Sequence, residues 1–153
     1  MFRQIAILAT VASCALTSGA IADEQADPNV NARQSYMGLL AYNLGVIGGM
    51  AQNRMPYDAD MAATAAANLH ALAMVDTSRM WAEGTDNFSM EDTRALPAIW
   101  DNSDDFSARF TAMQSATEAM MAVAGTDLAS LQGAMGGLGG ACGGCHQNFR
   151  QPQ

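Results

Sequence analysis

Two cysteines and a histidine stand together near the C-terminus, in the sequence Cys142-Gly143-Gly144-Cys145-His146. Two thiols at this spacing, followed directly by an imidazole, are what covalent attachment of a c-type haem requires. Each thiol can add to one vinyl group of the haem, and the histidine can coordinate the iron from the proximal side. The motif therefore predicts Cys142 and Cys145 as attachment points for one covalent haem c and His146 as its iron ligand.

Two other kinds of site use the same residue types. A redox Cys-x-x-Cys pair normally opens a helix inside a βαβ unit, whereas no strand pattern surrounds Cys142. A structural zinc site needs two further ligands, and the remaining cysteine and histidine are Cys14, in an apolar N-terminal run, and His70. Haem attachment is therefore the favoured interpretation, with a thiol pair or a metal site as the alternative.

The N-terminal residues are typical of an export signal. Residues 1–4 carry one positive charge, and residues 5–16 are nearly all apolar. Ala20-Ile21-Ala22, directly before Asp23, is a small-x-small cleavage site. Because the apolar run is too short to span a bilayer comfortably, the pattern favours a cleaved signal over a membrane anchor.

This signal fixes the expected domain limits and location. We predict a signal peptide over residues 1–22 and one domain over residues 23–153, of a length that suits a single core. The expected location is the periplasm, on the side of the membrane where bacteria attach haem covalently. The stretch Val11-Ala12-Ser13-Cys14 gives one alternative, since it resembles a lipoprotein acylation site that would tether the protein at Cys14.

The charge of the mature chain is strongly acidic. Removal of residues 1–22 takes away Arg3 and leaves six arginines and no lysine against fifteen acidic residues, a net charge of −9. Such a surface repels phosphate backbones and anionic lipid, so no nucleic acid or membrane partner is expected after signal cleavage. A basic redox partner protein would be attracted to it, although a solvated acidic surface without a partner explains the same charge.

The apolar pattern of the mature chain predicts helices and no strand. Asp27-Pro28 is a cap and first-turn pair, and Pro56 ends the helix that follows it. Asp58 can cap a second helix, which extends over residues 61–75 and is rich in strong helix formers. Apolar residues recur along the first helix at the alternating spacing of a bundle seam: Val30, Met37, Leu40, Leu44, Ile47 and Ala51.

A long connection separates these helices from two more. Residues 77–102 show no sustained periodicity, so we expect an ordered loop there. Ser103 opens a third helix, for which Gly125 is the expected C-cap, and Thr126 is the expected cap of a fourth. The apolar face of the third helix consists of Phe106, Phe110, Met113, Thr117, Met120 and Ala124.

Glycine crowds the predicted fourth helix, with seven glycines in residues 133–144. Each glycine inside a helix costs about 1 kcal/mol relative to alanine, so propensity alone predicts a loop. Bonds from haem to Cys142, Cys145 and His146 would favour the helix, and the missing side chains would admit the macrocycle and neighbouring helices. We therefore predict a helix that is soft in the absence of haem.

This organisation resembles the cytochrome c′ family, an all-α antiparallel four-helix bundle with one covalent haem near the C-terminus. In ordinary cytochrome c the attachment motif lies near the N-terminus and a methionine ligand follows it, whereas only seven residues follow His146 here. The resemblance covers essentially the whole mature chain. Its most specific block is residues 142–150, and the supporting blocks are Arg33-Gln34-Ser35, residues 81–85 and Pro97-Ala98-Ile99-Trp100.

The resemblance implies a role for several residues outside the motif. Arg150 would lie beside the proximal ligand His146, with its charge near the haem edge. Arg33 falls where the family places an arginine near a haem propionate, which implies a charge-assisted hydrogen bond. Met37 falls where the family covers the distal face, and Trp81 where an aromatic ring often packs over the pocket. Without the resemblance, Met37 is a seam residue, Trp81 a core residue and Arg33 a solvated charge.

The sixth coordination position decides the function that the family implies. A five-coordinate iron, only shielded by Met37, would bind NO or CO and pass single electrons. A six-coordinate, low-spin iron with Met37 as distal ligand would make an electron-transfer cytochrome of the same fold. His70 is expected to be a surface or hydrogen-bonded core residue and not a ligand. A haem-free helical binding protein is the alternative of another class.

No catalytic group accompanies the haem motif. The sequence shows no acid–base pair or nucleophile constellation, so an electron-transfer or gas-binding protein is expected and not an enzyme. The family also implies a homodimer, often formed through the first helix. Small residues in that helix would permit close approach of a second helix, from the same or another chain: Gly38, Ala41, Gly45, Gly48 and Gly49.

Overall fold

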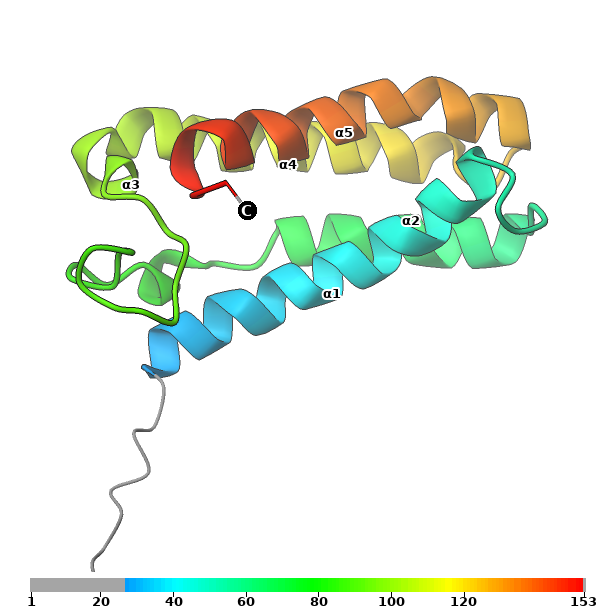
Figure 1. Cartoon of the computed structure of the whole chain (residues 1–153). Coiled ribbons are helices and arrows are strands. Elements are labelled where there is room, and N and C mark those ends of the chain that lie inside the picture. Colours follow the sequence, from blue (N-terminus) through cyan, green and yellow to red (C-terminus); the bar gives the residue numbers. More distant parts are fainter. Residues whose placement is uncertain (1–26, 153) are drawn as a thin grey trace, which may run out of the picture.

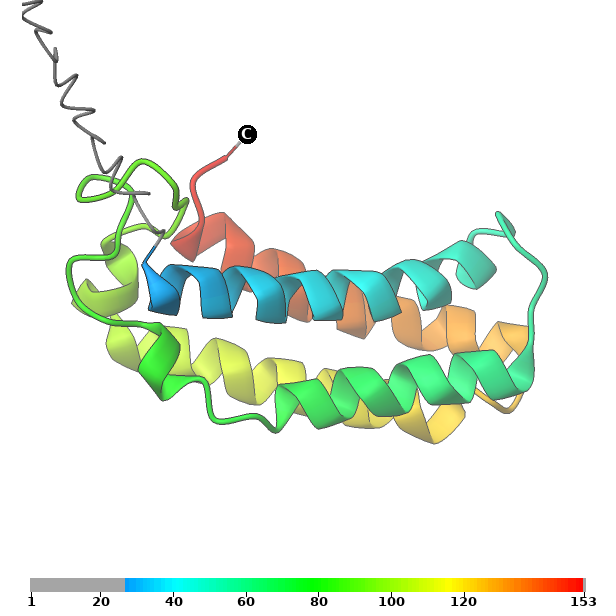
Figure 2. The ribbon, with the colours of Figure 1, turned by 90° about the horizontal axis from the view of Figure 1, so that it is seen from below.

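The computed structural model describes residues 27–152, which form a bundle of four long helices. The predicted signal peptide and Cys14 lie outside the described residues. The bundle consists of α1 (Pro28–Ala51), α2 (Ala59–Ala73), α4 (Ser103–Val123) and α5 (Leu128–Phe149). Each helix runs antiparallel to the one before it, as Figures 1 and 2 show. No helix within residues 27–152 is long and apolar enough to cross a membrane.

The four helices close into a ring of neighbours. Helix α1 packs against α2 and α5, and α4 packs against α2 and α5. The long connection between α2 and α4 contains a short 3₁₀ turn, η1 (Ser78–Met80), and a single-turn helix, α3 (Ala98–Asp101). This connection lies at the same end of the bundle as the start of α1 and the end of α5 (Figure 1). The fold thus brings the predicted connection to the Cys-x-x-Cys-His motif.

Aspartate side chains cap three of the four long helices. Asp27 accepts from the backbone N–H of Val30 at 3.2 Å, and Asp58 accepts from that of Met61 at 2.8 Å, which confirms both predicted caps. The predicted Thr126 cap of α5 is wrong. Asp127 accepts from the Ser130 N–H at 2.7 Å, and its charge also favours the positive end of the helix dipole.

The predicted C-cap role of Gly125 is also wrong. Helix α4 ends at Val123 with Ala124 as its right-handed C-cap, and Gly125 does not adopt a positive φ. A Cβ at Gly125 would lie 3.0 Å from the Ala63 Cβ and 3.3 Å from the Ala59 carbonyl oxygen. Gly125 is therefore needed because the turn after α4 passes close to α2.

The apolar core occupies the centre of the bundle. The side chains of Ile47, Met50, Met120 and Leu131 are fully buried there, and Leu138 nearly so. Alanines of α2 fill the remaining positions, so this helix packs closely against its neighbours. A second, smaller apolar cluster lies at the connection end of the bundle and consists of Ala95, Ile99 and Phe149, with Trp81, Ala98, Trp100, Phe106 and Cys145 packed against it.

Helix α5 is continuous through all seven of its glycines, as the sequence analysis predicts. The reason differs in part from the expected one. A Cβ at Gly133, or at any of the next five glycines, would meet no atom within 4 Å. At Gly144 it would lie 3.4 Å from an Arg109 nitrogen. No neighbouring helix therefore requires these glycines, and they leave one side of α5 bare.

Candidate haem site

Two adjoining cavities border the Cys-x-x-Cys-His motif. Met37, Cys145, His146 and Arg150 belong to the walls of both. The first, the connection-side cavity, has a volume of about 280 Å³ and is also lined by Arg33, Gln34, Trp81, Asp92, Thr93, Arg94, Ala95, Ile99, Phe106 and Phe149. The second, the bundle-side cavity, has a volume of about 230 Å³ and is also lined by Leu40, Ala41, Leu44, Leu69, Arg109, Phe110, Met113, Thr117, Leu138, Ala141 and Cys142.

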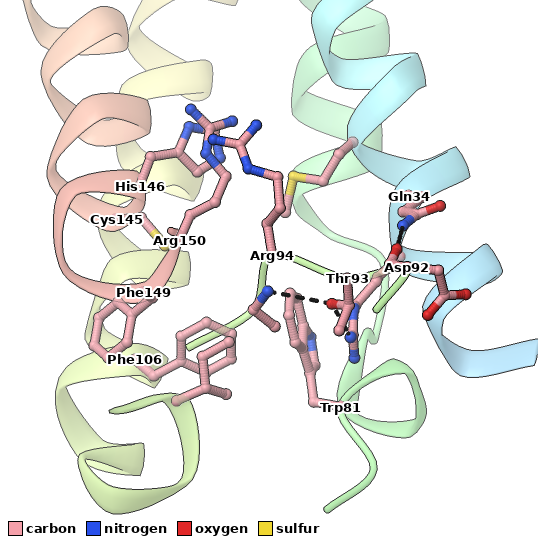
Figure 3. Close-up of a pocket in the computed structure, with 14 residues that line it drawn as sticks. Gln34, Trp81, Asp92, Thr93, Arg94, Phe106, Cys145, His146, Phe149 and Arg150 are labelled. Carbon is pink, nitrogen blue, oxygen red and sulfur yellow. Dashed lines mark hydrogen bonds between the residues drawn. The ribbon is translucent and has the colours of Figure 1, made fainter. Parts of the chain in front are cut away.

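Helical spacing places the motif residues on one side of α5. Residues three and four apart lie on the same face of a helix, so Cys142, Cys145 and His146 all reach the cavity walls. All three side chains are half-buried. Figure 3 shows Cys145, His146 and Phe149 projecting from the last turns of α5 toward the connection. The predicted attachment points and iron ligand therefore converge on one pocket.

The two thiols lack the properties of a reactive redox pair. They are not joined in a disulfide. Burial raises the pKa of both Cys142 and Cys145, and the positive charge of Arg109 offsets only part of this effect at Cys145. Reactive redox thiols have a lowered pKa, because the thiolate is the nucleophile. The environment of α5 therefore does not support the thiol-pair alternative.

A zinc site is not supported either. Within residues 27–152, no group of three or more histidine, cysteine or acidic side chains is placed to hold a metal ion. His70 lines neither cavity, and its Nδ1 lies 3.3 Å from the hydroxyl oxygen of Thr117. This placement agrees with the expectation that His70 is a surface or hydrogen-bonded core residue and not a ligand.

Burial and two nearby positive charges favour the neutral form of the His146 imidazole. Burial lowers its pKa, and the positive charges of Arg150 and Arg94 lower it further. A neutral imidazole keeps a nitrogen lone pair for a metal ion. The cavity therefore favours the form of His146 that can coordinate iron.

Arg33 is buried, with only 4% of its surface exposed, and anchors the connection to α1. One terminal nitrogen donates to the Thr85 hydroxyl at 2.7 Å and to the Met80 carbonyl at 3.3 Å. The other donates to the Thr93 hydroxyl at 2.6 Å and to the Thr85 carbonyl. Its guanidinium also lies over the Trp81 ring, 5.4 Å from the centroid. Four terminal N–H groups of Arg33 are thus used within the protein.

Aromatic rings from three elements form one corner of the connection-side cavity. The Trp81 and Phe106 centroids lie 4.8 Å apart in an edge-to-face arrangement, and Phe149 lies 5.2 Å from Phe106. The Trp100 indole N–H donates to the Trp81 carbonyl at 3.1 Å, and this bond links the end of η1 to α3. The sequence analysis identified Trp81, but missed Phe106 as a wall residue because it counted that ring only in an apolar seam.

Backbone hydrogen bonds join the residues at the end of α5 to the connection, beside the site. The Gln151 N–H donates to the Arg94 carbonyl at 2.8 Å, and the Leu96 N–H donates to the Phe149 carbonyl at 3.0 Å. These bonds flank an antiparallel bridge between Ala95 and Arg150. The sequence analysis did not identify Arg94 as a site residue, although an arginine in so acidic a chain is a signal that could have been used.

The residues around the motif fit a haem. The two thiols and His146 share the cavity walls, while Leu40, Leu44 and Phe110 offer an apolar surface to a macrocycle. The buried Nε of Arg109 has no hydrogen-bond partner within residues 27–152, so a bound group would find a buried donor there. Apolar walls with a few charged groups are the composition of a cofactor pocket.

Comparison with known proteins gives one consistent family. A family model described as Cytochrome C′ matches residues 28–150. Cytochrome c-554 of Cereibacter sphaeroides is 47% identical over 127 residues, which cover 83% of this chain and 83% of that protein. Cytochrome c′ of the same organism is 38% identical over 144 residues, which cover 94% of this chain and 95% of that protein.

Solved structures agree with this family in fold. A cytochrome c′ from Rhodobacter sphaeroides has a TM-score of 0.80 at 37% identity, and the match covers 82% of this chain and 96% of that one. Two variants of the Alcaligenes xylosoxidans cytochrome c′, one with bound carbon monoxide and one with nitric oxide, each have a TM-score of 0.69 at 27% identity. Those matches cover 81% of this chain and 94% of the variants.

The matched region contains all four long helices, the connection and the Cys-x-x-Cys-His motif. Fold, motif and sequence similarity therefore give the same answer. The chain belongs to the cytochrome c′ family, whose members bind one covalent c-type haem.

Proposed function

We propose that this protein is a periplasmic cytochrome with a five-coordinate haem that binds NO and CO and can pass single electrons. Cys142 and Cys145 hold the haem, and His146 coordinates its iron from the proximal side. Iron held in this way supplies one further coordination position and a one-electron redox couple. Arg33, Met37, Trp81 and Arg150, all in the cavity walls, are the further haem contacts.

The observation that carries this proposal is the apolar wall that α1 presents to the site. Met37, Leu40 and Leu44 lie one turn apart on this helix and line the bundle-side cavity. These three side chains are apolar and uncharged, an environment that suits a small uncharged gas. The CO and NO complexes of Alcaligenes xylosoxidans cytochrome c′ variants support this choice of ligand.

A six-coordinate electron-transfer cytochrome is the second candidate. Met37 borders both cavities together with His146, so its thioether sulfur is the candidate distal ligand. Met113 also lines the bundle-side cavity and offers a second sulfur. Neither candidate needs a catalytic residue, which accords with a carrier or gas-binding protein and not an enzyme.

Optical spectra distinguish the two candidates. Protein matured in a periplasm and reduced with dithionite is expected to show a high-spin ferrous spectrum that shifts when CO is added. The intact mass of the same sample is expected to equal residues 23–153 plus one haem, as signal cleavage before Asp23 requires. A sharp low-spin spectrum unmoved by CO would reject the gas-binding role and leave the electron carrier.

We further propose that two copies associate through α1. Leu39 and Tyr42 are 54% and 72% exposed on this helix, and Met61 of α2 is 45% exposed. Gly38 and Gly45, before and after Leu39 and Tyr42 along α1, are also exposed, and an added Cβ at either would meet no atom within 4 Å. Gly48 and Gly49 are buried against the protein's own methionines, so they serve packing within one copy: Met135 and Met55.

A negative charge on the exposed face of α1 is expected to prevent the two copies from associating. The wild type should sediment as a dimer, and Tyr42→Glu as a monomer, because a carboxylate at the centre of an apolar interface is poorly solvated. Phe88→Glu is the matched control, since Phe88 is 83% exposed in the connection and not on α1. Equal sedimentation of the Tyr42 and Phe88 variants would place the interface elsewhere.

A further inference from the structure

We propose that Arg94 is a haem-positioning residue that donates to a haem propionate from the connection. The inference rests on the haem site described above and assigns one of its contacts to a residue outside the Cys-x-x-Cys-His motif. It arises from the uneven distribution of positive charge in the protein.

Positive charge gathers around the two cavities. Six arginines lie within residues 27–152, and four of them line a cavity: Arg33, Arg94, Arg109 and Arg150. Their only acidic partner in an ion pair within these residues is Asp105, which lies 3.0 Å from Arg109. The site therefore has an excess of positive charge in a strongly acidic chain, and the two carboxylates of a haem would balance it.

Two of these arginines are less well placed than Arg94 to receive a propionate. Arg33 uses its four terminal N–H groups on Met80, Thr85 and Thr93. Arg109 is paired with Asp105, and its guanidinium lies against Gly144, between the two attachment cysteines. Because the vinyl and propionate groups of haem occupy opposite halves of the macrocycle, Arg109 is on the attachment side.

Arg94 has both the donor and the position. Its Nε and one terminal nitrogen donate to the Gln151 carbonyl, which fixes the guanidinium against the C-terminal segment. The other terminal nitrogen donates no hydrogen bond within residues 27–152, and Figure 3 shows the side chain extending from the connection toward His146. Arg94 lies in the connection beside the C-terminal end of α5 and acts electrostatically on His146.

A contact from Arg94 would stabilise both the cofactor's position and its reduced state. A carboxylate beside an apolar wall is costly unless a cation and hydrogen bonds compensate for the lost water. The cation also offsets the negative charge near the iron, which favours the reduced form. Asp92, in the same cavity wall, opposes this effect, while Arg33 and Arg150 act in the same direction.

The test measures the reduction potential of the purified holoprotein at pH 8, where propionates remain ionised. For Arg94→Gln we expect the equilibrium constant for reduction to fall about threefold to tenfold, and tenfold corresponds to about 59 mV. Arg79→Gln is the control, since it removes the same charge from the connection but lines neither cavity. Its change should stay below about twofold, because solvent screens an exposed charge.

A second readout reports the propionate directly. Loss of the Arg94 charge raises the pKa of its partner carboxylate, so the potential of Arg94→Gln should fall as pH rises between about 5 and 8.

Arg94→Lys keeps the charge and should alter only the propionate bending band in resonance Raman spectra. Equal potentials and pH profiles in Arg94→Gln and Arg79→Gln would overturn the proposal. If Arg94→Gln yields no holoprotein, an unchanged Raman band in Arg94→Lys would overturn it.

The haem content of each variant separates this inference from the proposed function. Absence of covalent haem from the wild type would reject the haem site itself. Covalent haem in the wild type and Arg94→Gln, with potentials that match the control, would reject the role of Arg94 alone.

Discussion

Replacing Cys142 and Cys145 together by serine is expected to abolish covalent haem and to loosen the second half of α5. Serine is close to cysteine in shape but forms no thioether with a vinyl group. Haem should then be extracted by acidified organic solvent, whereas it stays with the wild-type chain. Amide hydrogen exchange over residues 133–144 should become at least about tenfold faster, a loss of about 1.4 kcal/mol in local stability.

The glycines of α5 are the reason for this expected loss. Seven glycines at about 1 kcal/mol each make this helix about 7 kcal/mol less favourable than an alanine helix. That cost is comparable with the whole stability of a small domain, which is about 5–15 kcal/mol. Packing offsets part of it through the buried side chains of Leu131, Leu138 and Phe149. The thioether bonds and the bond from His146 to iron are the remaining restraints on this end of the helix.

A rescue experiment tests this explanation. Gly136→Ala and Gly140→Ala introduce two Cβ atoms that meet no atom within 4 Å, so together they should add about 2 kcal/mol of helix stability. In the double-serine background they should slow amide exchange again without restoring covalent haem. Exchange over residues 133–144 that is the same in the double-serine chain and the wild type would contradict the role assigned to haem.

The haem motif and the bundle could be predicted because their signals are local. The five-residue spacing of the motif, the Asp27 and Asp58 caps and the seam of α1 each depend on neighbours within a few turns. The limits of α4 and α5 were less accurate, because the choice between Thr126 and Asp127 as cap depends on how the turn packs. Gly125 was misassigned for a similar reason. The turn that contains it passes so close to α2 that a Cβ would crowd that helix, and this contact has no local sequence signal.

The environment of the site could not be predicted to the same degree. Arg94 is thirteen residues after Trp81 and lies far from the motif in sequence, and the bridge between Ala95 and Arg150, with the hydrogen bonds beside it, brings it to the cavity. No pattern in the sequence predicted that Arg33 would donate its hydrogen bonds to residues of the connection. Such contacts between distant segments depend on tertiary packing, for which a single sequence carries no periodic signal.

Shortening Met37 to alanine is expected to open the distal side of the site. Met37 is half-buried in α1 and belongs to the walls of both cavities, with Leu40 one turn further along. If the iron is five-coordinate, the side chain only restricts the space above it. Its removal should raise the affinity for CO about tenfold, which corresponds to about 1.4 kcal/mol.

The same variant separates the two candidate functions. If the Met37 sulfur is the sixth ligand, the wild type is low-spin and unreactive toward CO, and Met37→Ala becomes high-spin and binds CO. Met135→Ala is the matched control, because Met135 is also half-buried but lies in the main core and in neither cavity. Equal CO affinities and spectra for the wild type and both variants would show that Met37 neither shields nor coordinates the iron. Met113, the other methionine in the bundle-side cavity, would then be the next residue to replace, since its sulfur would be the remaining candidate within these walls.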